Sequence, residues 1–231
     1  MDYILEGFTQ AFGLIFSMNE ETWSAVVATV KLTSLSMLVT LLLGLPLGFA
    51  LGYFNFRGKR FLRMIVDTLL ALPTVVVGLL VYAFISNRGP LGSWRLLFSI
   101  KGMAIGQTIL ALPIVIALTA SAIEGLDNRL RTTLLTLGAN GWRMAASCLL
   151  ESRFAILVAA MTAYGRIVAE VGVSMMLGGN IKWNTRTITT AITLETGKGD
   201  FALGIALGIL LLAISFMLNA LLSLVRRRVD A

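Results

Sequence analysis

The sequence is poor in charge and lacks most of the residues that build metal or acid–base sites. Of its 231 residues, 19 are Lys or Arg and 12 are Asp or Glu, which is 13%, whereas a soluble domain carries about a quarter. It contains no His and a single Cys, Cys148. Imidazole catalysis, His or Cys metal centres and an intrachain disulfide are therefore excluded. We expect no catalytic residue, no bound metal and no cofactor.

The few charges are clustered, so that long stretches contain none. Four charge-free windows cover residues 32–56, 68–87, 102–123 and 201–225, and about 20 apolar residues suffice for a helix to cross a bilayer. A fifth apolar stretch is interrupted only by Arg166 and Glu170. The pattern predicts an all-α, polytopic membrane protein with five transmembrane helices, at about residues 24–53, 64–86, 102–123, 154–177 and 201–225.

The basic residues predict how these helices are oriented. Four lie in residues 54–63, four in 124–153 and three in the C-terminal tail, which makes eleven on one side against six on the other. Residues 1–22 carry four acidic residues and no basic one. Because Lys and Arg concentrate in cytoplasmic loops, we expect the N-terminus outside, as an extracytoplasmic or interfacial segment, and the C-terminus in the cytoplasm. The net charge of +7 then reports topology rather than a nucleic-acid partner.

Proline and glycine mark two further features of the expected helices. Residues 68–73, TLLALP, resemble residues 108–113, TILALP, and a proline at similar depth in two helices would bend both. Chance similarity of two apolar strings is the alternative. Gly44, Gly48 and Gly52 recur every four residues, which favours close packing of their helix against a neighbour.

The cytoplasmic segment 124–153 has the pattern of two short helices rather than of a loop. Leu126, Leu130, Leu134 and Leu137 recur at helical spacing, and the residues from Gly138 to Gly141 favour a turn before a second helix from Trp142. Such an elbow suits insertion into a groove of a partner protein. Periodicity alone equally fits a helix lying on the membrane surface.

Two ionisable residues lie deep in the fourth expected helix. Arg166 is twelve residues beyond its inner end, about 18 Å into the bilayer, and Glu170 follows one turn later. Charges at that depth usually face a polar path or a partner charge, so the pair marks either a gate or a packing ion pair.

Residues 178–190 are rich in hydroxyl and amide donors, which suit a tetrahedral oxyanion, although a solvated or docking loop is the alternative.

These motifs resemble those of the membrane subunits of binding-protein-dependent ABC importers. Residues 137–143, LGANGWR, resemble the family's ATPase-docking loop, but residues 132–134 are Thr-Thr-Leu where the family has Glu-Ala-Ala, and residues 150–151 are Leu-Glu where it has Leu-Pro. Residues 166–172 look like the Arg-x-x-x-Glu-x-Gly of molybdate, tungstate and sulfate permeases. Residues 179–181 and 185–186 continue that pattern, and residues 189–195 and 198–200 are most similar to Tup-type tungstate permeases.

The resemblance implies a type I ABC importer permease fold over residues 23–228, in the cytoplasmic membrane and in contact with lipid. It implies a second copy of the chain, two ABC ATPase subunits and an extracytoplasmic oxyanion-binding protein as partners. No phosphate-binding G-x-x-x-x-G-K-[ST] motif is present, so the chain is expected to be a transport subunit and not itself an enzyme. Its expected cargo is tungstate, with molybdate or sulfate as alternatives. An ion-driven carrier or a channel is the alternative from another functional class.

The resemblance also assigns two groups of site residues. The residues expected to couple the chain to its ATPase lie in the cytoplasmic elbow: Leu134, Gly138, Ala139, Gly141, Trp142 and Arg143. The residues expected to form the gate or anion path lie in the fourth helix and beyond: Arg166, Glu170, Gly172, Asn180, Thr185 and Arg186.

Overall fold

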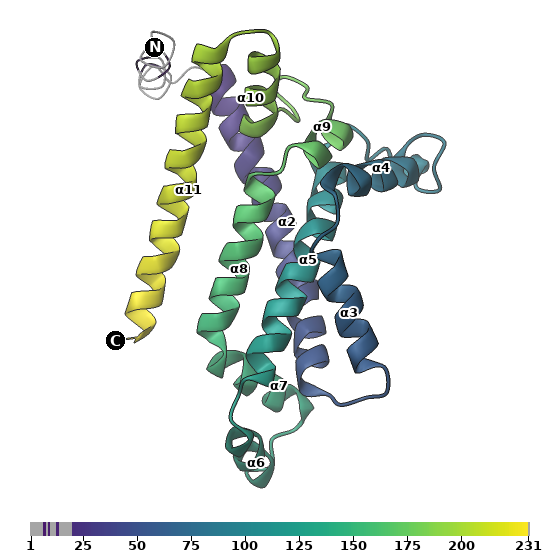
Figure 1. The fold of residues 1–231 in the computed structure, drawn as a ribbon, viewed down its shortest axis with the longest axis vertical. Helices are drawn as coiled ribbons and strands as arrows, with labels where there is room; N and C mark the ends of the chain where they lie inside the picture. Colours follow the sequence, from purple (N-terminus) through teal and green to yellow (C-terminus); the bar gives the residue numbers. More distant parts are fainter. Residues whose placement is uncertain (1–6, 8, 10–12, 14–19, 231) are drawn as a thin grey trace.

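The computed structural model describes residues 7, 9, 13 and 20–230, in which the regular structure is helical (Figure 1). Most of the predicted N-terminal segment, residues 1–22, thus lies outside the described residues. The α-helices are α2 (Glu20–Tyr53), α3 (Lys59–Leu69), α4 (Thr74–Ile85), α5 (Ile100–Glu124), α6 (Asn128–Thr136), α7 (Gly141–Glu151), α8 (Arg153–Val168), α9 (Gly172–Gly178), α10 (Ile188–Gly197) and α11 (Phe201–Asp230). A 3₁₀ turn, η1, covers Gly92–Trp94.

Helices α2 and α5 form the central pair, in agreement with the predicted spans 24–53 and 102–123. They are 34 and 25 residues long and lie side by side along most of the molecule. Gly44, Gly48 and Gly52 face α5, and a Cβ added at each would lie 2.8, 2.7 and 2.7 Å, respectively, from an atom of α5. The glycines therefore set how closely the two backbones approach.

The predicted single helix over 64–86 is wrong. The chain forms α3 and α4 instead, which are bent by 100° at the break between them. Pro73 stands at the N-cap of α4 with extended backbone, φ −65° and ψ 125°, and a residue preceding proline is disfavoured in the helical region. Pro113, in the similar string, lies inside an unbroken α5, so the two prolines do not act alike.

The predicted single helix over 154–177 is also interrupted. Helix α8 ends at Val168, and α9 begins again at Gly172. At the other end of α8, the axis bends by 73° relative to α7 at Ser152. The segment beyond α9 was not predicted to be helical, but it contains α10.

The remaining helices pack around the central pair. Helix α8 contacts α5 and α2, whereas α11 packs mainly on α10, through a core formed by Ala25, Val26, Ile188, Ala191 and Leu207. Helix α4 projects sideways from the bundle and packs on α9 (Figure 1). Helices α6 and α7 lie at one end of the molecule, and α9 and α10 lie toward the other.

Among the described residues, α2 and α5 are long and apolar enough to cross a membrane alone. The pairs α3–α4 and α7–α8 pass the same test only if each bent pair is counted as one span. Helix α11 contributes a shorter apolar stretch, Phe201–Met217.

We predict that Gly48→Ala destabilises the protein, because the new methyl group would lie 2.7 Å from the Cβ of Thr119 and 3.0 Å from the Ile116 carbonyl oxygen. Overpacking of this kind costs about 1–3 kcal/mol. Thermal unfolding in detergent measures the effect. Gly208→Ala in α11 is the matched control, since its Cβ meets nothing within 4 Å. Equal melting temperatures for the two variants would contradict the close α2–α5 contact.

Candidate functional site

The elbow is built from α6, a tight turn and α7. Asp127 and Asn140 cap the two helices by accepting hydrogen bonds from the backbone N–H groups of Arg129 and Arg143, both at 2.9 Å. Between them Gly138 has φ +73°, a conformation that favours glycine. The predicted pair of helices with a turn at Gly138 is therefore confirmed.

The elbow has one packed face and one exposed face. Leu134 and Ala139 pack with the buried Met144 and Cys148 of α7, in a cluster that also contains Phe49 and Ile123 of the central pair. Leu137, expected on the same apolar face, is 77% exposed, and Trp142 is 79% exposed. Leu137 is the residue after the end of α6, so its side chain no longer lies on the apolar face of that helix. Two large apolar side chains thus lie at the surface of the end that projects from the bundle.

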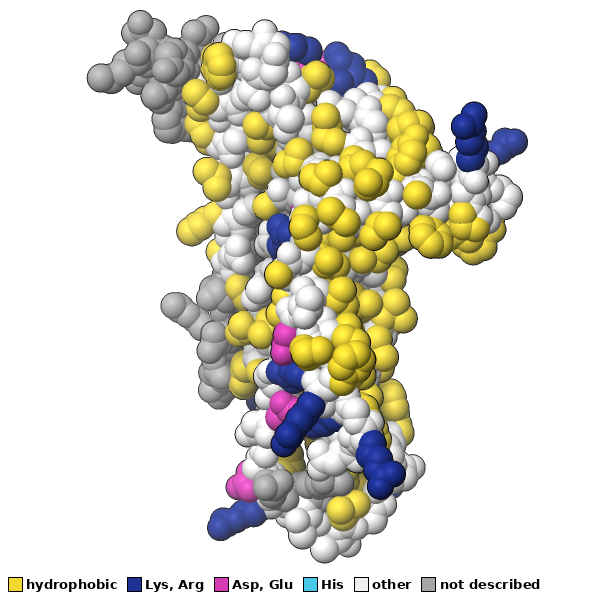
Figure 2. Space-filling view, turned by 45° about the vertical axis from the view of Figure 1, so that its right-hand side comes forward, with side chains coloured by type: hydrophobic (Ala, Val, Ile, Leu, Met, Phe, Trp, Pro, Cys, Tyr) yellow, Lys and Arg dark blue, Asp and Glu magenta, His cyan; other side chains and the backbone are white. Residues whose placement is uncertain are grey.

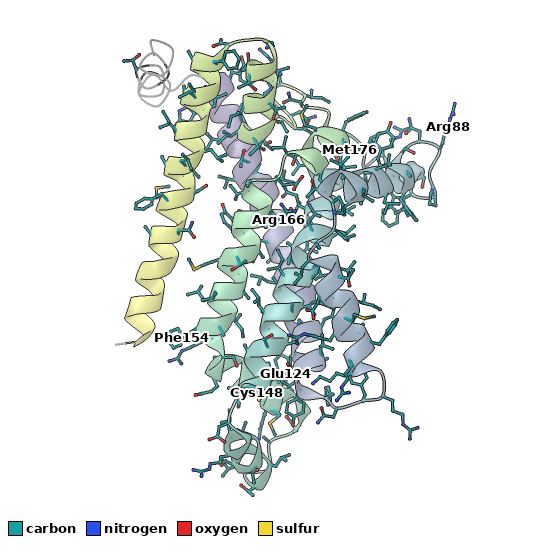
Figure 3. The ribbon with its side chains drawn as sticks, viewed as in Figure 1. Arg88, Glu124, Cys148, Phe154, Arg166 and Met176 are labelled. Carbon is teal, nitrogen blue, oxygen red and sulfur yellow. The ribbon has the colours of Figure 1, made fainter. Side chains whose placement is uncertain are left out.

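The second group of predicted residues meets where α8 ends. Glu170 is 3% exposed, and its Oε1 accepts a hydrogen bond of 3.0 Å from the backbone N–H of Val173, at the start of α9. Its Oε2 lies 3.9 Å from Nη1 of Arg166, one turn earlier. The Arg166 side chain is 42% exposed and lies in the last turn of α8 (Figure 3). The buried carboxylate is thus held by the backbone, while the cation beside it stays accessible.

Gly172 follows directly after this pair, at a position where a side chain would be crowded. A Cβ at this position would lie 3.2 Å from Oγ1 of Thr74 and 3.3 Å from Oε1 of Glu170. The absence of a side chain lets the start of α9 approach both the start of α4 and the carboxylate.

A buried amide, which the sequence reasoning missed, joins four helices at the same break. Gln107 of α5 is 1% exposed. Its Nε2 donates to the Ile167 carbonyl of α8 at 3.2 Å and to Oγ of Ser174 in α9 at 3.4 Å, and its Oε1 accepts from Oγ of Ser36 in α2 at 3.0 Å. The sequence does contain a signal for this contact, because Gln107 is the single side-chain amide in the charge-free window 102–123. A polar group inside a membrane needs hydrogen-bond partners.

The last three predicted gate residues lie together beyond α9. Oδ1 of Asn180 accepts from Nε of Arg186 at 3.2 Å, and Oγ1 of Thr185 donates to the Gly178 carbonyl. Nη1 of Arg186 also pairs with Oε1 of Glu21 at 2.7 Å. This ion pair holds the loop before α10 against the start of α2. No hydrogen bond or ion pair given for the described residues joins this group directly to Arg166.

Comparison with known proteins places this architecture in a family. The model of the family described as "binding-protein-dependent transport system inner membrane component" matches residues 44–231. This chain belongs to that family. It is therefore an inner-membrane component of a binding-protein-dependent transport system, as the resemblance predicted.

Individual relatives agree. The chain is 50% identical to the tungstate uptake system permease protein TupB of Campylobacter jejuni, over 95% of this chain and 92% of the relative. It is 35% identical to TupB of Peptoclostridium acidaminophilum, over 96% and 97% of the two chains. The molybdenum transport system permease protein ModB of Escherichia coli is 30% identical over 79% of this chain and 84% of its own.

Solved structures support the fold. A chain of the MetNI methionine ABC transporter in an inward-facing conformation superposes with a TM-score of 0.73, covering 92% of this chain and 98% of that one, at 17% identity. A bacterial ABC transporter that imports alginate gives a TM-score of 0.76 at 19% identity, covering 96% and 84%. The arrangement in Figure 1 is thus that of an ABC importer permease.

We predict that Gly138→Ala loosens the elbow. A residue with a Cβ at φ +73° is strained by about 1–2 kcal/mol, although space for the methyl group is open. Faster limited proteolysis within residues 128–151 measures the loss. Gly141→Ala is the control, because its Cβ also meets nothing within 4 Å and it lies inside α7. Equal cleavage rates in the two variants would show that the turn imposes no strain.

We also predict that Gln107→Leu destabilises the bundle by about 1–3 kcal/mol, because it removes one hydrogen bond from each of three buried partners, in α2, α8 and α9. Chemical denaturation in detergent measures this. Ser36→Ala should cost less, since it removes one of these bonds and keeps both contacts to α8 and α9. The assignment would be contradicted if Gln107→Leu were the milder variant.

Proposed function

We propose that this protein is the permease subunit of an ATP-driven importer of tungstate. The observation that carries the proposal is the 50% identity, over 95% of the chain, to a permease named for tungstate uptake. A relative from a second organism carries the same name at 35% identity. Molybdate is the second candidate because of the 30% identity to ModB, and sulfate follows through the CysT permease of Escherichia coli, also at 30%.

The proposed topology has five spans within residues 23–228, with the N-terminus outside and the C-terminus in the cytoplasm. The spans are α2, the bent pair α3–α4, α5, α8 with α9, and α11. The distribution of basic residues supports this orientation, because the α2–α3 connection and the elbow lie at the same end of the molecule. That end would then be cytoplasmic.

ATP hydrolysis belongs, in this proposal, to two separate ATPase subunits that receive the elbow. Leu137 and Trp142 supply the exposed apolar contacts that a groove on a partner protein would bury. Leu134, Gly138 and Ala139, with the backbone N–H of Arg143, hold the elbow in shape, and Gly141 starts α7. Movement of an attached ATPase would pass to the bundle through Met144 and Cys148, which pack with the inner ends of α2 and α5.

The second proposed partner is another copy of the chain. Helix α4 carries exposed apolar residues, among them Val75, Leu79 and Leu80, on an arm that projects from the bundle (Figure 2). Arg166 is also open to one side of the single chain. A two-fold assembly would enclose both features, with the translocation path between the copies. An extracytoplasmic oxyanion-binding protein would deliver the cargo at the other end from the elbow.

In the proposed gate, the oxyanion replaces the weak contact between Arg166 and Glu170. The 3.9 Å separation is long for an ion pair, and Glu170 keeps its backbone hydrogen bond when Arg166 turns away. Arg166 would bind the passing anion, and the buried carboxylate would prevent tight retention by competing for the same guanidinium. Asn180, Thr185 and Arg186 would line the outer mouth, where Glu21 neutralises Arg186 at rest.

Uptake into proteoliposomes tests the function. The permease, reconstituted with its ATPase and binding protein, should accumulate tungsten only with hydrolysable ATP, and tungstate should outcompete molybdate and sulfate. Uptake that follows an ion gradient without ATP would establish a secondary carrier instead. Preference for molybdate would leave the transporter class intact and change the cargo.

We predict that Arg166→Leu lowers the maximal uptake rate at least about tenfold, since a cation is removed from an intramembrane anion path. Arg166→Lys should retain part of the rate. ATP hydrolysis by the assembled complex, measured in parallel, should persist because the elbow is unchanged. Normal uptake by Arg166→Leu would assign the Arg166–Glu170 pair to helix packing.

A further inference from the structure

The basic residues around the start of α3 are divided between two environments. Lys59 pairs with Glu124 at the end of α5 at 2.9 Å, and Arg63 contacts the same carboxylate at 3.3 Å and Asp67 at 3.6 Å. These two cations therefore face acidic partners and hold α3 against α5.

Arg57 and Arg60 lie in the other environment. Both are exposed, and neither forms an ion pair with a residue that the structure describes. Because Lys59 and Arg63 balance the two acidic residues Glu124 and Asp67, the cluster keeps a net charge of +2 that belongs to these two arginines.

The surface beside Arg60 is hollowed. One hollow of about 320 Å³ is lined by Asn55, Phe56, Gly58, Lys59 and Arg60. It shares Asn55, Lys59 and Arg60 with a larger open groove of about 710 Å³, which continues along α3 past Met64 to Thr68 and is lined there by Arg63 with its acidic partners Asp67 and Glu124. The groove therefore begins beside Arg60 and runs along α3.

Helix α3 also carries exposed apolar side chains next to these arginines in the sequence. Phe61, Met64 and Ile65 are all exposed, whereas Val66 is the buried residue of the helix. Helix α3 runs beside the lower half of α5 (Figure 1), and apolar side chains cover much of this flank (Figure 2). In an inner-membrane protein, a cationic hollow followed by an apolar helix face matches a phosphate group followed by acyl chains.

We propose that Arg57 and Arg60 bind the phosphate of an anionic phospholipid, whose acyl chains lie along Phe61, Met64 and Ile65. Charge complementarity selects an anionic over a zwitterionic lipid, and the adjoining apolar face selects a lipid over a soluble phosphate. The site is independent of the proposed cargo, because it uses no residue of the α8–α9 break. Bound there, the lipid would fix the position of α3, which Lys59 and Arg63 tie to the end of α5 from which the elbow continues.

The experiment uses the full chain in nanodiscs that contain three parts phosphatidylcholine and one part phosphatidylglycerol. After mild transfer to detergent, mass spectrometry measures the ratio of the two lipids that stay bound. The wild type should retain phosphatidylglycerol well above its share in the disc. Arg57→Gln with Arg60→Gln should lower that enrichment by about fivefold for each arginine removed.

Two control pairs make the result specific. Arg88→Gln with Arg95→Gln removes the same charge from exposed positions on the α4–η1 arm and should keep the enrichment, whereas Arg57→Lys with Arg60→Lys should retain most of it. The proposal is overturned if the wild type shows no enrichment, or if the Gln pair at positions 57 and 60 retains it. It is also overturned if the arm variant loses the lipid equally.

A measurement on the wild type alone separates the possible ligand sources and needs no folded variant. Dihexanoyl phosphatidylglycerol added in detergent should displace the retained lipid, while inorganic phosphate at the same concentration should not. Equal displacement by the two would identify a soluble-anion site and refute the lipid assignment.

Discussion

The close contact between α2 and α5 is the constraint on which the other elements depend. Three glycines, one every four residues, bring the two backbones to a distance that no larger side chain permits. Helix α5 then offers its remaining faces to α3, α8 and α9. Because dispersion and close packing, rather than exclusion of water, hold helices together in lipid, a loss of fit along this seam would shift every element that α5 positions, Gln107 included.

Composition predicts the continuous helices well and the broken ones poorly. Charge-free windows identified α2, α5 and α11, since burial in lipid imposes a run of apolar residues. The charge-free window 68–87 runs through Pro73, and the fifth apolar stretch continues past Glu170, although the chain breaks at both places. Whether a helix bends or ends there depends on what the neighbours offer, and Pro113 shows that the same local string stays helical inside the α2–α5 contact.

In the candidate site, sequence spacing predicts contacts between residues about one helical turn apart. Contacts between residues far apart in the sequence depend on the fold. The i, i+4 relation brought Arg166 and Glu170 together from the sequence alone, and the turn at Gly138 followed from residue type. The bond from Gln107 to Ile167 and the pair between Arg186 and Glu21 span 60 and 165 residues. No periodicity encodes such separations; they follow once α5 meets α8 and the loop before α10 folds back onto α2.

The two helix breaks differ in the groups that close them. At the first break the N-cap residue of α4, Pro73, has no N–H group, and the turn before it closes with backbone hydrogen bonds donated by the N–H groups of residues 70–72. Between α8 and α9, by contrast, backbone groups are satisfied by the side chains of Gln107, Glu170 and Thr189. A break closed by side chains can be rearranged by exchanging one partner for another, whereas a proline break is fixed by covalent geometry. In the proposed gate, an anion that competes for Arg166 would therefore act at the break that is able to respond.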